Sequence, residues 1–141
     1  MSEAFGGAPN GSAASSYSAG DDGVLSVLSG SVANSQTASC WVVTTNNGKF
    51  AFVSNTGSST ISSYQIGAGD GTLTLANPVA ADTGANSAPI DMAFNVSSHF
   101  LYVLLGGSQG VASFRVEHDG SLTLIDSDLG LPLGAQGIAA K

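Results

Sequence analysis

Phe50-Ala51-Phe52-Val53 is the stretch that decides the fold, because it returns fifty residues later as Phe100-Leu101-Tyr102-Val103. Two further segments repeat with nearly the same offset: Ile61-Ser62-Ser63-Tyr64 returns as Val111-Ala112-Ser113-Phe114, and Gly71-Thr72-Leu73-Thr74-Leu75 returns as Gly120-Ser121-Leu122-Thr123-Leu124. An earlier partial copy reads Ala14-Ser15-Ser16-Tyr17 and then Asp22-Gly23-Val24-Leu25-Ser26-Val27. Short apolar runs that recur at this distance predict one four-stranded antiparallel sheet per repeat.

The strands of each repeat are separated by turn signals. Asn47-Gly48 is a strong two-residue hairpin signal, and Asp70-Gly71 and Asp119-Gly120 mark later turns. Strands are expected in the middle repeat over 41–45, 50–55, 60–66 and 72–77, and in the next repeat over 90–95, 100–105, 110–116 and 121–126. Residues 100–105 are all apolar, which indicates burial on both faces of the sheet, as between neighbouring blades.

The repeats therefore predict an all-β chain that forms a partial β-propeller of about three blades. We expect a partial blade over 1–34, complete blades over 38–80 and 88–128, and the first strand of a further blade over 134–141. The terminal blades of such an arc would expose apolar faces, which invite association. Two explanations stay open: the chain is a fragment of a longer protein, or copies assemble head to tail and complete one another's open blades.

Composition and charge exclude several classes of partner. The chain has 141 residues, of which 43% are apolar and 9% charged, and ten acidic residues against three basic ones give a net charge of −7. Without a cationic stripe to neutralise phosphates, we expect no nucleic-acid binding and no attraction to an anionic membrane.

Targeting and cysteine chemistry say little about the compartment. The first residues lack a basic start followed by an apolar run, so no signal peptide is predicted, and no apolar run is long enough to span a membrane. Cys40 is the single cysteine, which leaves no intrachain disulfide and no cysteine-based zinc site. We expect Cys40 to be a small buried hydrophobe, since no histidine lies near it in sequence.

Four residues are candidates for a site. Asp91 begins a predicted first strand, where side chains approach the central channel, and could act as a general base; the alternative is an Asp bonded to nearby backbone N–H groups. Glu3 could bind sugar hydroxyls or activate water at the rim of a blade, or it could lie at a frayed terminus. Trp41 could stack on a sugar ring or pack between blades, and Asn55 is the second candidate for substrate binding.

Metal ligation is weakly supported. His99 and His118 both precede turns and lack the paired spacing of metal ligands, so we expect exposed turn residues and no metal site. No cofactor is predicted, although the acidity leaves a divalent cation possible.

The chain resembles the carboxyl-terminal part of seven-bladed propellers of the lactonase type, a family similar to 6-phosphogluconolactonase and to the carboxymuconate-lactonising enzyme. The resemblance depends on Asn47-Gly48-Lys49-Phe50-Ala51-Phe52-Val53-Ser54-Asn55, Ile61-Ser62-Ser63-Tyr64-Gln65-Ile66, Asp70-Gly71-Thr72-Leu73-Thr74-Leu75 and Ala88-Pro89-Ile90-Asp91-Met92-Ala93-Phe94. It implies hydrolysis of a sugar lactone or cyclisation of an unsaturated dicarboxylate, and a small-molecule lactone or sugar as the partner.

The resemblance carries no catalytic pair into this sequence. The family often places Pro-Arg-His before the apolar part of a first strand, and the matching positions here read Pro89-Ile90-Asp91 and Ser39-Cys40-Trp41. Neither retains the Arg or the His. The sequence thus leaves two classes open: a lactonase-type enzyme, and a non-catalytic propeller that binds a carbohydrate or protein or serves as a scaffold.

Overall fold

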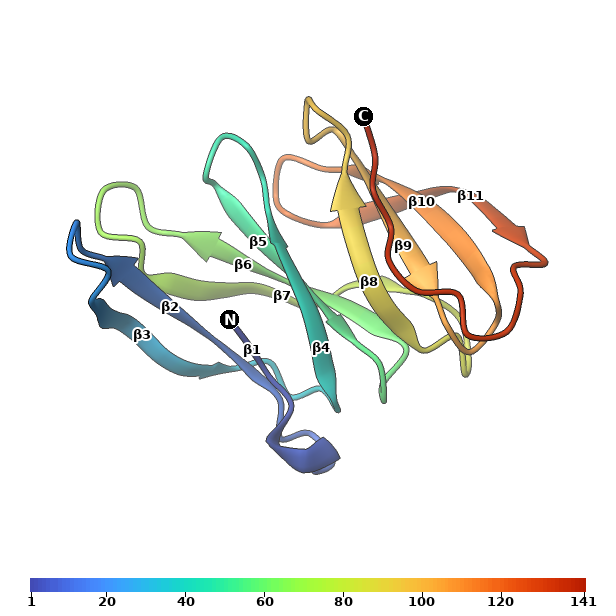
Figure 1. Ribbon diagram of the computed structural model, residues 1–141, viewed down its shortest axis with the longest axis horizontal. Coiled ribbons are helices and arrows are strands. Elements are labelled where there is room, and N and C mark those ends of the chain that lie inside the picture. Colours follow the sequence, from blue (N-terminus) through green and yellow to red (C-terminus); the bar gives the residue numbers. More distant parts are fainter.

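The computed structural model describes residues 1–141, which form three antiparallel sheets side by side (Figure 1). Blade 1 contains β1 (Ser2–Glu3), β2 (Ala13–Ala19) and β3 (Leu25–Ala33); blade 2 contains β4 (Ser39–Thr44), β5 (Phe50–Asn55), β6 (Thr60–Ile66) and β7 (Leu73–Asp82); blade 3 contains β8 (Pro89–Phe94), β9 (Phe100–Leu105), β10 (Gly110–Val116) and β11 (Leu122–Leu129). In every blade the strands pair in chain order, which confirms the predicted all-β fold of partial propeller type.

The alternation of side chains along blade 2 explains why both of its faces are buried. Phe52 pairs with Ser63 and Ser54 pairs with Ile61, so these four residues share one face of the sheet. The opposite face carries Val53 and Tyr64, which are fully buried toward blade 1. An isolated sheet would leave both of these faces in water, so blade 2 needs a neighbour on each side.

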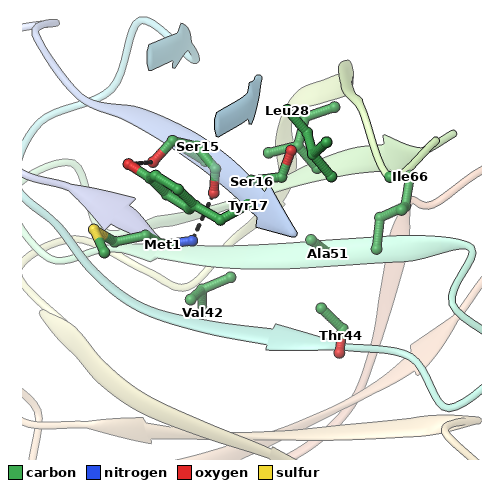
Figure 2. A pocket seen from close by; sticks show the side chains of 12 residues that line it. Met1, Ser15, Ser16, Tyr17, Leu28, Val42, Thr44, Ala51 and Ile66 are labelled. Carbon is green, nitrogen blue, oxygen red and sulfur yellow. Dashed lines mark hydrogen bonds between the residues drawn. The ribbon is translucent and has the colours of Figure 1, made fainter. Parts of the chain in front are cut away.

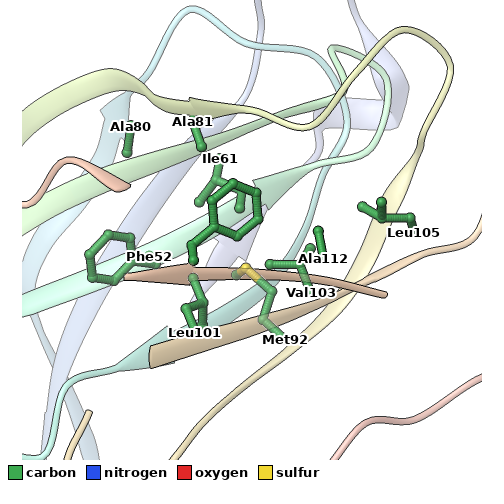
Figure 3. Close-up of a cluster of buried hydrophobic side chains, with 10 residues drawn as sticks. Phe52, Ile61, Ala80, Ala81, Met92, Leu101, Val103, Leu105 and Ala112 are labelled. Atoms are coloured by element: carbon green, nitrogen blue, oxygen red, sulfur yellow. The ribbon is translucent and has the colours of Figure 1, made fainter. Parts of the chain in front are cut away.

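The largest core lies between blades 2 and 3. It contains ten buried side chains drawn from both blades (Figure 3). Phe52 of β5 meets Phe94 of β8 edge to face, with ring centroids 5.7 Å apart. The core between blades 1 and 2 contains four buried residues, namely Ala14, Ala51, Val53 and Tyr64.

The outer hairpins of blades 2 and 3 use the same turn chemistry. Asp70 Oδ1 accepts the backbone N–H and the hydroxyl of Thr72 at 3.1 and 2.9 Å. Asp119 Oδ1 accepts the same two groups of Ser121 at 3.0 and 2.7 Å. These hydrogen bonds lower the pKa of both carboxyl groups, because they stabilise the charged form.

Three expectations about local structure are wrong. Residues 134–141 form no strand, and the segment lies outside every sheet. The fourth strand of blade 2 continues past the expected residue 77 to Asp82, because a register shift near Ser62 lets β6 pair with a longer partner. Cys40 is exposed and not buried, since it lies at the inner edge of blade 2, which no further strand covers.

Candidate functional site

Glu3, Trp41 and Asp91 lie on β1, β4 and β8, and β4 contacts both β1 and β8 (Figure 1). We call Glu3, Cys40, Trp41 and Asp91, together with Ser2 and Ile90, the inner rim. The hydroxyl of Ser2 donates to the Cys40 carbonyl at 2.9 Å, and Cys40 Sγ lies 3.6 Å from the Ile90 carbonyl oxygen. These contacts connect β1, β4 and β8 at one edge.

Asp91 uses both carboxylate oxygens within the chain. Oδ1 accepts the N–H of Met92 at 2.7 Å, and Oδ2 accepts the N–H of Ile138 at 3.1 Å. The second bond fastens the carboxyl-terminal segment to the start of β8. A carboxylate held by two backbone N–H groups is poorly placed to take a proton from a substrate, so this geometry favours the structural interpretation of Asp91 over the general base.

Glu3 is half-buried on β1 and keeps one free oxygen. Its Oε2 accepts the hydroxyl of Ser31 at 2.7 Å, while Oε1 has no hydrogen-bond partner in the chain. Its charge also lies near enough to Tyr64 to help burial raise the pKa of that phenol, with burial the larger cause. Glu3 is therefore an ordered carboxylate at the rim and not part of a frayed terminus.

Trp41 and Cys40 present accessible side chains at the same edge. Trp41 is 46% exposed, and its backbone N–H donates to Ser54 Oγ at 3.0 Å, which fixes the start of β4. A shallow cavity of about 240 Å³ is lined by both residues together with Met1, Ser2 and Val42. An indole that is half in solvent beside a shallow cavity is able to stack on a flat or cyclic ligand.

Asn55 is inaccessible, so the expectation that it binds substrate does not fit its position. Its relative exposure is 0%, and its Oδ1 accepts hydrogen bonds from Asn34 Nδ2 at 3.0 Å and Ser39 Oγ at 2.7 Å. Its Nδ2 donates to Thr60 and Ser62. Burial of an amide requires such partners, and this network connects blade 1 to blade 2.

The largest cavity lies away from the candidate carboxylates. It measures about 460 Å³, separates blades 1 and 2, and is mostly apolar (Figure 2). Ser16 Oγ, on its wall, is buried without a hydrogen-bond partner. Met1 closes one side, where its ammonium group donates to the Ser15 carbonyl. No residue with catalytic chemistry predicted from the sequence lines this cavity.

The model of the lactonase family of seven-bladed β-propellers matches residues 20–135, so the chain belongs to that family. No curated protein matches the chain.

Solved structures show the same fold. The periplasmic gluconolactonase PpgL of Pseudomonas aeruginosa is 22% identical with a TM-score of 0.69, over 89% of this chain and 38% of that one. A candidate 6-phosphogluconolactonase from Bacteroides fragilis is 23% identical with a TM-score of 0.71, over 87% and 39%. A protein from Lactobacillus plantarum is 29% identical with a TM-score of 0.70, over 82% and 35%. The chain thus spans well under half the length of these proteins.

The structure contains no helix with the length and apolar character required to cross a bilayer. No three His, Cys, Asp or Glu side chains lie close enough together to hold a metal ion.

Proposed function

We propose that the chain forms one wall of a ligand channel in a lactonase-type propeller, and that Trp41 and Glu3 face a cyclic sugar or lactone there. The observation that supports this proposal is an exposed indole on β4 and a half-buried carboxylate on β1, two strands that contact each other. An indole supplies a stacking surface, and the free Oε1 of Glu3 supplies an acceptor for a sugar hydroxyl or for water.

The single tryptophan makes this proposal testable, because Trp41 is the only indole in the chain. Titration with gluconolactone, and with gluconate as the open-ring product, should change the tryptophan fluorescence in a saturable way. Glu3→Gln should weaken the response several-fold, whereas Asp21→Asn, which removes an exposed loop carboxylate of blade 1, should leave it unchanged. A linear, unsaturable response that is the same in all three proteins would contradict binding at the inner rim.

A non-catalytic role for this arc is the second candidate, and the inner strands favour it. Neither β4 nor β8 carries an Arg or His at its start. Both carboxylate oxygens of Asp91 already accept hydrogen bonds from backbone N–H groups. Proton release from gluconolactone separates the two candidates. Acceleration that Glu3→Gln abolishes supports an enzyme, whereas saturable fluorescence with no acceleration supports a binding wall.

A further inference from the structure

A second cavity lies at the opposite end of the same strands. It is enclosed by the β4–β5, β8–β9 and β10–β11 hairpins and measures about 280 Å³. Its polar lining comprises Asn47, Lys49, Ser98, His99, Glu117 and His118. We call it the hairpin pocket. Because the inner rim lies at the starts of β4 and β8 and this pocket lies past their ends, the length of a six-residue strand, roughly 20 Å, separates the two.

The hairpin pocket collects the basic side chains of an acidic chain. The sequence has three Lys and Arg residues and two His residues against a net charge of −7. Lys49, His99 and His118 all line this one cavity, and none of the three has an ion-pair or side-chain hydrogen-bond partner. Lys49 and His99 occupy the same position of successive repeats, after the first turn of their blades. Scattered surface residues would not be expected to converge in this way.

The acidic groups nearby are already engaged. Glu117 Oε1 accepts hydrogen bonds from Arg115 Nε at 2.9 Å and from Thr123 Oγ1 at 2.7 Å. These bonds lower the pKa of Glu117, with the Thr123 hydroxyl the larger cause. Asp119 beside His118 has its Oδ1 occupied by the N–H and hydroxyl of Ser121. The cationic groups are thus left free for an external anion, while the carboxylates have internal partners.

The walls of the pocket are fixed by contacts between hairpins. The N–H of Asn46 donates to Ser98 Oγ at 2.9 Å, which joins the first two hairpins. Asn77 Nδ2 donates to the Asp119 carbonyl at 3.1 Å, which ties the third hairpin to blade 2. Phe50 packs so closely on Gly120 that a Cβ there would lie 2.7 Å from its ring. A pocket held in this way loses little conformational entropy when a ligand enters.

We propose that the hairpin pocket binds a small anion with a phosphate or carboxylate group. Lys49 supplies a positive charge, and the imidazoles of His99 and His118 supply N–H donors. Each can interact with an oxygen of a phosphate or carboxylate group, so removal of the Lys49 charge should weaken binding.

The test is a titration of the intact chain with inorganic phosphate and, separately, acetate, followed by NMR of the two imidazoles at constant ionic strength in NaCl. We expect saturable shifts of both rings with phosphate. Lys49→Gln should weaken binding on the order of tenfold, a difference of about 1.4 kcal/mol. Lys141→Gln, which removes a lysine outside the pocket, should have no effect, and the backbone amide spectrum checks that both variants fold.

Each outcome decides the proposal. Saturable phosphate shifts with weak acetate shifts identify a phosphate-selective pocket, and comparable shifts identify a general anion pocket; both support the inference. Shifts that do not saturate, or that are the same in the Lys49 and Lys141 variants, overturn it. The result is independent of gluconolactone binding at the inner rim, because Trp41 lies near the start of β4 and Lys49 lies in the hairpin that follows β4.

Discussion

Blade 2 meets its two neighbours through very different interfaces. Toward blade 3 it contributes to a core of ten buried apolar side chains, whereas toward blade 1 the core has four. Blades 2 and 3 each supply four strands, while blade 1 supplies three, of which β1 has only two residues. A groove of about 460 Å³ also lies between blades 1 and 2. The comparison shows that blade 2 buries more apolar side chains against its four-stranded neighbour than against its three-stranded one.

The weaker interface relies on polar contacts instead. The Asn34–Asn55 hydrogen bond and the bond from the Tyr64 hydroxyl to the Val32 carbonyl, at 3.0 Å each, both cross from blade 1 to blade 2. Buried hydrogen bonds specify geometry, but each adds only about 1 kcal/mol net. Blade 1 should therefore separate from blade 2 before blade 2 separates from blade 3.

The largest expected effect concerns association through the open ends. Val27 of blade 1 and Leu129 of blade 3 are both 63% exposed, among other apolar residues at each end. We propose that copies associate head to tail through these faces, so light scattering should give a mass that rises with concentration from 13.9 kDa toward twice that value. Val27→Lys should shift the rise to higher concentration. A strictly monomeric species at high concentration would rule this assembly out.

Truncation of the central aromatic residue should reveal the stronger core. Phe52→Ala removes a fully buried ring from the interface with blade 3 and should cost about 3–5 kcal/mol in the free energy of unfolding. Val53→Ala, the adjacent residue on the face toward blade 1, removes less volume next to an existing groove and should cost about 1–2 kcal/mol. Urea denaturation measures both. Equal losses would mean that the two interfaces do not differ as described.

Removal of the central side chain of the buried polar network should lower the free energy of unfolding. Asn55→Ala leaves the buried Asn34 and Ser39 groups without their acceptor and should cost about 2–3 kcal/mol. Asn77→Ala, which removes a partly exposed amide from the other interface, should cost less than about 1 kcal/mol. Urea denaturation of this matched pair measures how much more the buried amide contributes to the free energy of unfolding. An Asn55→Ala variant with unchanged stability would show that the network does not join the blades.

Removal of one hydroxyl should loosen blade 1 selectively. Tyr64→Phe leaves the Val32 carbonyl without its partner and should cost about 1 kcal/mol. Hydrogen exchange should accelerate in β2 and β3 and stay unchanged in β9 and β10. Burial raises the pKa of Tyr64, so the wild-type chain should also lose stability as the pH rises above about 10, the value of a free phenol, and Tyr64→Phe should lose less.

The smallest expected effects on stability concern the aspartates of the outer turns, and they should be equal in blades 2 and 3. Asp70 and Asp119 make the same turn, and their hydrogen bonds lower both pKa values, so the stability they add is present above about pH 4 and is lost as the pH falls through the lowered values. Asp70→Asn and Asp119→Asn should each reduce the acid sensitivity of unfolding slightly and to the same extent. A larger effect at Asp119 would indicate that His118 adds to its role in the turn.

Sequence patterns were sufficient for the fold because the information is local and repeated. Apolar alternation and Asp-Gly or Asn-Gly turns recur after about fifty residues, and each predicts a strand or a hairpin without knowledge of its neighbours. The exposed positions of His99 and His118 also follow from their turns. The repeat offset of fifty residues places His99 at the position that Lys49 occupies in the preceding repeat. This shared position is the one signal in the sequence for the hairpin pocket.

The strand pattern and the family membership were thus determined by the order of residues alone, since short-range propensity and periodicity encode them. Only the tertiary structure decided four further features. Asn55 is buried, Cys40 is exposed, Asp91 accepts a hydrogen bond from Ile138, and Lys49 lines one cavity with two histidines. Each of these depends on which blade lies beside which, and packing between residues separated by tens of positions leaves no mark in a local pattern.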